Sequence, residues 1–235
     1  MKRRQFLMSG AAAGLWAASR DVLAASDEQA TQKSRSSRPL PRPERGLIRA
    51  AFAISRGTTE IDYIGPRAVF EVWGQDPETK KHAPRFELYT VSHTRDPIDG
   101  RIADHTFESA PPPHVVVVPA QRGSKELLDW LRKFAPKTDV TMSVCVGARH
   151  LARAGLLDGK SATSHHGAID QLAEEFPRVN WVTGVRFVEE IGISTAAGLT
   201  AGIDLALHVL ERYFGRDEAL KAAEHLEYES KSWQT

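Results

Sequence analysis

Residues 140–155 read VTMSVCVGARHLARAG, an apolar run that ends at a cysteine and passes directly into a helical pattern. The pattern predicts a strand over 140–144, Cys145 at its end, and a helix over 148–154. A sharp strand-to-helix turn holds a side chain out at the sheet edge, and a small residue such as Gly147 lets the backbone turn. The stretch therefore predicts a cysteine nucleophile elbow.

Strands alternate with helices on both sides of this elbow. The run His114–Pro119 holds four consecutive valines, so both of its faces are expected to be covered, as in a parallel sheet. Further strands are expected at 47–54, 86–92, 101–107, 180–182, 186–188 and 191–195, and further helices at 61–73, 124–134, 168–176 and 198–214. This alternation predicts a three-layer α/β sandwich with a mostly parallel sheet.

Cys145 is the one cysteine of the chain, so no internal disulfide can form. The helix that starts behind it supplies positive partial charge and free N–H groups, which favour the nucleophilic thiolate and can bind a developing oxyanion. The alternative is a buried cysteine that acts as a small hydrophobic residue. The local pattern alone does not separate the two.

Asp62 follows the first expected strand, at the carboxyl edge of the sheet where Cys145 is also predicted. Ligands in such folds bind beyond this edge. A carboxyl group beside a thiol can act as a general acid or base, or hydrogen-bond the thiolate. Alternatively, Asp62 only favours the N-terminal end of its helix through the helix dipole.

Three stretches of the chain carry a resemblance to a known family. They are IDYIGPRAVFEV at 61–72, SVCVGA at 143–148 continued by LARAGLLDGKSAT at 151–163, and TAAGLTAGIDLALH at 195–208. These stretches resemble the ThiJ/PfpI (class I glutamine-amidotransferase-like) superfamily, in particular the branch with isonitrile hydratases and the amidotransferase-like domains of AraC-type regulators. The resemblance covers residues 47–214 and implies a flavodoxin-like sandwich that forms a homodimer.

The resemblance also implies roles for individual residues. Cys145 would attack a small electrophilic carbon such as that of an isonitrile, and Asp62 would contact the cysteine and transfer the proton. The backbone N–H groups of Val146 and of Ala120 or Gln121 would hold the developing charge. Water would then release the product, which is a formamide in the isonitrile case.

Two residues are expected near the rim of this pocket. The branch has a histidine at the position of His165, although His165 and His166 can equally form a surface pair at a helix start. Arg122 follows the run Pro119-Ala120-Gln121, where the family usually has Gly-Gly. Its charge would suit an anionic ligand, and it can equally point into water.

Val146 departs from the family pattern. Isonitrile hydratases have threonine directly after the cysteine and peptidase-like members have histidine, whereas the Val146 side chain can neither donate nor accept a hydrogen bond. The alternative to an enzyme is therefore a non-catalytic small-molecule-binding or redox-sensing module, in which Cys145 would oxidise to a sulfenic or sulfinic acid. AraC-type regulators carry a DNA-binding domain after this one; too few residues follow Phe214 for it, so none is expected.

The first residues read as a targeting signal. Arg3 and Arg4, followed by Gln-Phe-Leu, fit the twin-arginine pattern; a mildly apolar run follows, and VLAA at 22–25 allows cleavage after Ala24 or Ala25. We therefore expect a signal peptide over 1–25, a disordered linker over 26–45 and the domain over 46–235, located in the periplasm or secreted. A short membrane anchor is the alternative, but the apolar run is short for a spanning helix, so no stable membrane insertion is expected after cleavage.

Charge and composition limit the classes of ligand and partner that the protein is expected to bind. A net charge of +1 gives no electrostatic reason to bind nucleic acid, and the histidines lack metal-ligand spacing, so a small-molecule ligand is expected without a metal or cofactor. The apolar content of 41% can form a real core.

Asp204 and His208, four residues apart on a predicted helix, are expected to pair with each other. Residues 216–235 are expected to form a short helix and a polar tail.

Overall fold

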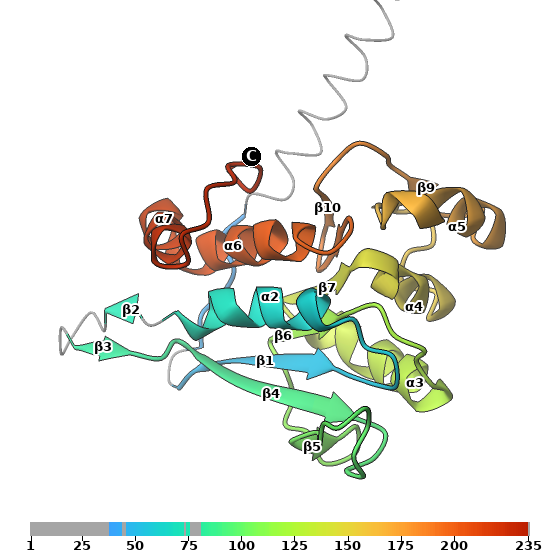
Figure 1. Cartoon of the computed structure of the whole chain (residues 1–235), viewed down its shortest axis with the longest axis horizontal. Coiled ribbons are helices and arrows are strands. Elements are labelled where there is room, and N and C mark those ends of the chain that lie inside the picture. The colour runs from blue at the N-terminus through green and yellow to red at the C-terminus, as the bar shows by residue number, and fades with distance from the viewer. Residues whose placement is uncertain (1–37, 44–45, 73, 76–80, 235) are drawn as a thin grey trace, which may run out of the picture.

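The computed structural model describes residues 38–43, 46–72, 74–75 and 81–234. Its centre is a seven-stranded sheet with the order β10-β11-β7-β6-β1-β4-β5 (Figure 1). The strands are β1 (Ile48–Ala53), β4 (Phe86–Ser92), β5 (His105–Thr106), β6 (Val115–Val118), β7 (Val140–Val144), β10 (Phe187–Glu190) and β11 (Ile193–Ala196). Every neighbouring pair is parallel except β10 with β11. The predicted flavodoxin-like sandwich with a mostly parallel sheet is therefore confirmed.

Different helices cover the two faces of this sheet (Figure 1). The main helices are α2 (Glu60–Glu71), α3 (Lys125–Phe134), α4 (Ala148–Arg153), α5 (Ile169–Glu175), α6 (Ala201–Phe214) and α7 (Arg216–His225). Ala50 and Phe52 of β1 pack with residues of α2, α6 and α7, whereas Ala51 and Ala53 pack with residues of α3 and α4. Because successive residues of a strand point to opposite faces, each strand contributes to both layers of the core.

Short elements complete the layers. Two small two-stranded sheets pair β2 (Gly74–Gln75) with β3 (His82–Ala83), and β8 (Ser161–Ala162) with β9 (Asn180–Trp181). Three single turns are 3-10 helical: η1 (Ala135–Lys137), η2 (Cys145–Gly147) and η3 (His166–Ala168). The η2 turn joins β7 to α4, so it forms the predicted elbow.

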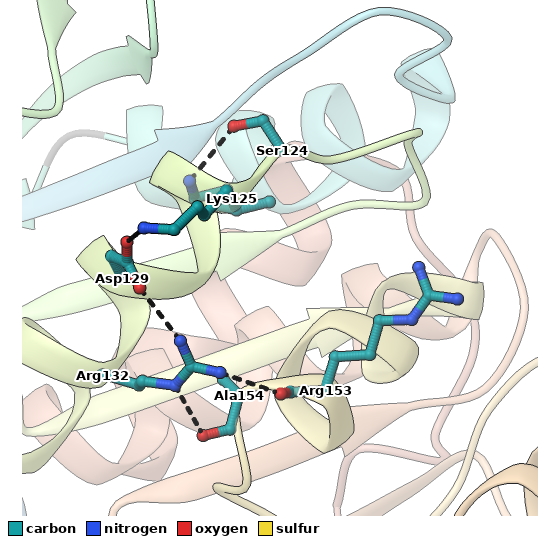
Figure 2. A network of polar contacts seen from close by, with 7 residues as sticks. Ser124, Lys125, Asp129, Arg132, Arg153 and Ala154 are labelled. Atoms are coloured by element: carbon teal, nitrogen blue, oxygen red, sulfur yellow. Dashed lines mark hydrogen bonds and ion pairs between the residues drawn. The ribbon is translucent and has the colours of Figure 1, made fainter.

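The short helix α4 behind the elbow is held at its far end by α3 (Figure 2). The guanidinium of Arg132 donates to the carbonyl oxygens of Arg153 at 3.2 Å and Ala154 at 3.3 Å, and it pairs with Asp129 at 3.0 Å. The last carbonyls of a helix have no partner within that helix, and Arg132 supplies one from the neighbouring helix. This contact fixes the direction of α4 and so supports the elbow.

Both ends of the described chain pack on the domain. Leu40 is buried, and its N–H donates to the carbonyl oxygen of Arg212 at 2.9 Å. At the other end Trp233 is fully buried in the core, although the sequence predicts only a polar tail after α7.

The predicted signal peptide over 1–25 and most of the predicted linker lie outside the described residues. Within the described part of the chain, no helix is both long enough and apolar enough to cross a membrane.

The expected pairing of Asp204 with His208 is wrong. Asp204 accepts hydrogen bonds from Arg186 at 2.6 Å and Ser230 at 2.9 Å, whereas His208 meets Glu189 at 2.6 Å. Both residues of α6 are buried, and a buried charge requires close partners. Those partners come from neighbouring segments of the fold, which spacing along one helix cannot reveal.

Candidate functional site

Cys145 stands at the end of β7 in a strained backbone conformation. Its φ of +58° lies in the left-handed region, which is uncommon for any residue other than glycine. The strain is held by two hydrogen bonds: the Cys145 N–H donates to the carbonyl oxygen of Ala197 at 2.9 Å, and the Ser164 hydroxyl donates to the Cys145 carbonyl oxygen at 2.9 Å. A β-carbon at Gly147 would collide with the carbonyl oxygen of Val118, so this position requires glycine.

Asp62 lies in the first turn of α2 and is fully buried beside Cys145. Its Oδ2 accepts the N–H of Ala120 at 3.1 Å, and its carboxyl group interacts with the Cys145 thiol. Its Oδ1 has no nitrogen or oxygen hydrogen-bond partner among the described residues. The structure thus brings together the two residues that the sequence placed at the same sheet edge, and it leaves one carboxylate oxygen available for chemistry.

The electrostatics of this pair favour a protonated resting thiol. Burial raises the pKa of Cys145, and the charge of Asp62 raises it further, whereas the backbone N–H groups of Val146 and Leu199 lower it. Burial also raises the pKa of Asp62, opposed by the Ala120 N–H, the Cys145 thiol and the charge of His165. The expectation that the helix start favours thiolate is therefore outweighed in the resting site. A base must remove the proton before the sulfur reacts, and Asp62 is the carboxyl group in contact with it.

One of the expected backbone donors already has a partner in the structure. The Ala120 N–H is already used by Asp62, and the Gln121 side chain donates to the carbonyl oxygen of Ala53 at 2.8 Å. The backbone N–H groups that lower the pKa of the Cys145 thiol are those of Val146 and Leu199. Sequence reasoning missed Leu199 because its contribution is a backbone N–H. Every residue except proline has this group, so the residue type gives no signal for it. The indirect signal was the glycine before it, since Gly198 lets the segment pass close to the site.

His165 lies next to this segment. A β-carbon at Gly198 would collide with the His165 ring, so glycine is what allows their contact. The Gly167 nitrogen lies 3.1 Å from Nδ1 of His165. The ring also stacks on His166, with centroids 4.4 Å apart. His165 is half-buried and acts on Asp62 through its charge, as a residue at the rim of the site would.

The remaining histidine near the elbow has a supporting position. His150 is buried, and its Nε2 lies 3.0 Å from the carbonyl oxygen of Gln121. Burial lowers the pKa of His150. It therefore fixes the loop that carries the Ala120 N–H, while Arg122 in the same loop is exposed. Among the described residues, no three His, Cys, Asp or Glu side chains gather as a set of metal ligands.

Comparison with known proteins agrees with this arrangement. The DJ-1/PfpI family model matches residues 48–212. The isonitrile hydratase of Pseudomonas putida is 35% identical over 188 residues, which cover 77% of this chain and 78% of that protein. The HTH-type transcriptional regulator CdhR of Pseudomonas aeruginosa is 37% identical over 107 residues, 45% of this chain and 31% of that protein.

A solved structure is similar over the same region. The crystal structure of a ThiJ/PfpI family protein from Pseudomonas syringae has a TM-score of 0.67 and 27% sequence identity, and the similarity covers 81% of this chain and 78% of that chain. The family match begins at β1 and reaches into α6, so it includes every strand of the large sheet and the elbow. The chain belongs to the DJ-1/PfpI family.

Proposed function

We propose that the protein is a cysteine-dependent enzyme that adds water to a small electrophilic carbon, with an isonitrile as the first substrate class. The observation that carries this proposal is the buried Asp62 carboxyl group, with one oxygen lacking a nitrogen or oxygen partner, beside the one thiol of the chain. The similarity to the isonitrile hydratase of Pseudomonas putida, which spans 78% of that protein, supports the substrate class.

The first half of the reaction forms a bond between sulfur and carbon. The Cys145 sulfur attacks the terminal carbon of R–N≡C while Asp62 takes the thiol proton and delivers it to that carbon. The product is a thioimidate, R–N=CH–S, attached to Cys145. The N–H groups of Val146 and Leu199 stabilise the sulfur as it gains negative charge.

The second half consumes one water molecule. Asp62 takes a proton from the water as its oxygen adds to the same carbon, and it passes that proton to the nitrogen. The tetrahedral adduct then breaks its C–S bond, and its hydroxyl proton returns to the sulfur. The products are the formamide R–NH–CHO and free Cys145, so the net change is one water added to the isonitrile. Because the Val146 side chain has no hydroxyl group, Asp62 performs both proton transfers.

Formation of formamide from an alkyl isonitrile, followed by NMR, tests this proposal. Cys145→Ala should abolish turnover, and Asp62→Asn should lower kcat by about 10²–10⁴-fold, the usual contribution of a general acid or base. Asp158→Asn is the matched control, because Asp158 is a surface carboxylate paired with Arg178 at 2.6 Å. Turnover that persists in Cys145→Ala would overturn the proposal.

The second candidate is a redox-sensing or ligand-binding module without turnover. Its support is the similarity to part of a transcriptional regulator, together with Val146 in place of a hydroxyl-bearing residue. Mild peroxide should then add one or two oxygen atoms to Cys145, as measured by intact mass. Cys145→Ser should show no such addition, and an unmodified wild-type protein would exclude this candidate.

We also propose that the protein is exported by the twin-arginine route to the periplasm or beyond. The support is the sequence RRQFL at residues 3–7 and the small residues at 22–25. Replacement of Arg3 and Arg4 by lysine should keep the unprocessed chain in the cytoplasm, as seen by fractionation and mass. An unchanged distribution would contradict this route.

A homodimer is proposed as the assembly. Ile61 and Ile64 on α2 are 37% and 45% exposed, an apolar surface that a second copy can cover. Light scattering after size exclusion should give twice the chain mass, and Ile64→Glu should give the monomer mass. A wild-type monomer at micromolar concentration would contradict the proposal.

A further inference from the structure

The segment from Ala197 to Thr200 begins with a direct contact to Cys145. The carbonyl oxygen of Ala197 accepts the Cys145 N–H at 2.9 Å, and the backbone N–H of Leu199 lowers the pKa of the Cys145 thiol. Leu199 adopts a φ of +52°, although its side chain is 43% exposed and gains little from burial. A bulky residue in the left-handed region is strained and persists only where its surroundings enforce that conformation.

Arg186 holds this segment at both ends. Its carbonyl oxygen accepts the Ala197 N–H at 2.9 Å, and its guanidinium donates to the Thr200 hydroxyl at 3.1 Å. The same guanidinium donates to Oδ2 of Asp204 at 2.6 Å. Asp204 is fully buried in the first turn of α6, so it gives the Arg186 side chain one defined orientation.

The C-terminal tail completes the contacts of Asp204. The Ser230 hydroxyl donates to Oδ1 of Asp204 at 2.9 Å, and the Tyr228 hydroxyl donates to the carbonyl oxygen of Thr200 at 3.4 Å. Trp233 anchors the tail, because its ring is fully buried and its Nε1–H donates to the Ser230 carbonyl oxygen at 2.9 Å. A continuous set of contacts therefore joins the tail to both ends of the segment 197–200.

We propose that the Leu199 amide is a hydrogen-bond donor to the anionic sulfur of Cys145, and that Arg186, Asp204 and Ser230 are positioning residues for that amide. This inference rests on the proposed function only in taking Cys145 as the reactive group, and it does not depend on the substrate. The tail after α7 thereby takes part in the site, although it lies outside the residues that match the family model.

A purely structural role predicts a different result. If these residues only stabilised the start of α6, their loss would lower the stability of the fold without changing the acidity of the thiol. If they place a donor on the sulfur, their loss must raise the pKa of Cys145, because the thiolate then loses a hydrogen bond that lowers this pKa. The rate of thiol alkylation as a function of pH separates the two cases.

The experiment measures iodoacetamide alkylation of Cys145 in the full chain across pH. Ser230→Ala and Arg186→Gln should slow alkylation about three- to tenfold below the thiol pKa, the effect expected for one weakened hydrogen bond, and Ser230→Thr should restore the wild-type rate. Replacing Leu199 by its α-hydroxy acid removes the N–H and keeps the side chain, and it should slow alkylation by at least as much. Asp62, which contacts the thiol, and His165, which acts on Asp62, are unchanged in all of these variants.

Tyr213→Phe is the matched control, because it removes a hydroxyl bond to Asp139 of 2.8 Å from the opposite end of the same helix. It should leave the pH profile of alkylation unchanged. A wild-type profile in the Leu199 ester variant would overturn the role of the amide, and an equal slowing in Tyr213→Phe would overturn the role of the positioning residues. Absence of isonitrile turnover beside the expected alkylation profile would reject the proposed substrate and leave this inference standing.

Discussion

At the scale of single residues, the site depends on a carboxyl group that the fold holds at an energetic cost. Asp62 is fully buried, and its accepted hydrogen bond from Ala120 only partly replaces the water that burial removes. Burial therefore raises its pKa, so the folded protein binds the proton of Asp62 more tightly than the unfolded chain does. Groups held in this way are common at functional sites.

Asp62→Asn should consequently stabilise the protein at neutral pH while it lowers activity. The stability that Asp62 contributes is fully present below its usual pKa of 3.8 and is lost as the pH rises through the raised folded value. A neutral amide avoids this loss, so the free energy of unfolding at pH 7 should rise. Urea unfolding at pH 7 and below about pH 4 measures the difference, which should vanish at the lower pH. Equal destabilisation at both pH values would contradict this account.

The residues of the site differ in how far the sequence could identify them. Cys145 and Asp62 were predictable because each follows a strand, and the carboxyl ends of parallel strands meet at one edge. It was not predictable that the Ala120 amide binds Asp62 or that the Leu199 amide lowers the pKa of the Cys145 thiol. Backbone donors are selected by φ angles and by competing acceptors, and both exist only after the loops have packed.

At the scale of elements, the position of α6 determines whether the site can form. A β-carbon at Gly202 would lie 2.8 Å from one methyl carbon of Val144 and 3.2 Å from Cγ of Pro66. The first turn of α6 therefore touches both the strand that ends in Cys145 and the helix that carries Asp62. The sequence predicted these helices and strands within a few residues, but it could not show that α6 approaches α2 and β7 this closely.

Gly202→Ala should destabilise the protein by about 1–3 kcal/mol, because the added methyl group overpacks this contact. The closest atoms belong to Val144, so Val144→Ala in the same chain should recover part of the loss. A double-mutant cycle by urea unfolding measures the coupling, and the double variant should be less destabilised than the sum of the single variants. Strict additivity would show that the methyl group is accommodated elsewhere.

At the scale of the whole molecule, two terminal segments complete the core of the domain. Both lie outside the pattern of alternating strands and helices. Trp233 and Leu40 are single apolar residues within polar stretches, so they carry no periodic signal for prediction. Both are buried in the core layer that contains α6 and α7. The cleavage predicted after Ala24 or Ala25 would leave the segment around Leu40 in the mature chain, where it can remain part of the fold.

Leu40 should therefore contribute to the stability of the mature domain despite its place in the predicted linker. Its N–H binds the carbonyl oxygen of Arg212, and the Arg212 guanidinium donates to the carbonyl oxygen of Arg38 at 3.0 Å while pairing with buried Glu189. Leu40→Ala removes most of a buried side chain and should lower the free energy of unfolding by about 2 kcal/mol. Pro41→Ala, at an exposed neighbouring position, should change it by less than about 0.5 kcal/mol. Equal urea midpoints for the two variants would mean that the segment detaches in solution, whereas the expected difference would make residues 38–43 part of the domain.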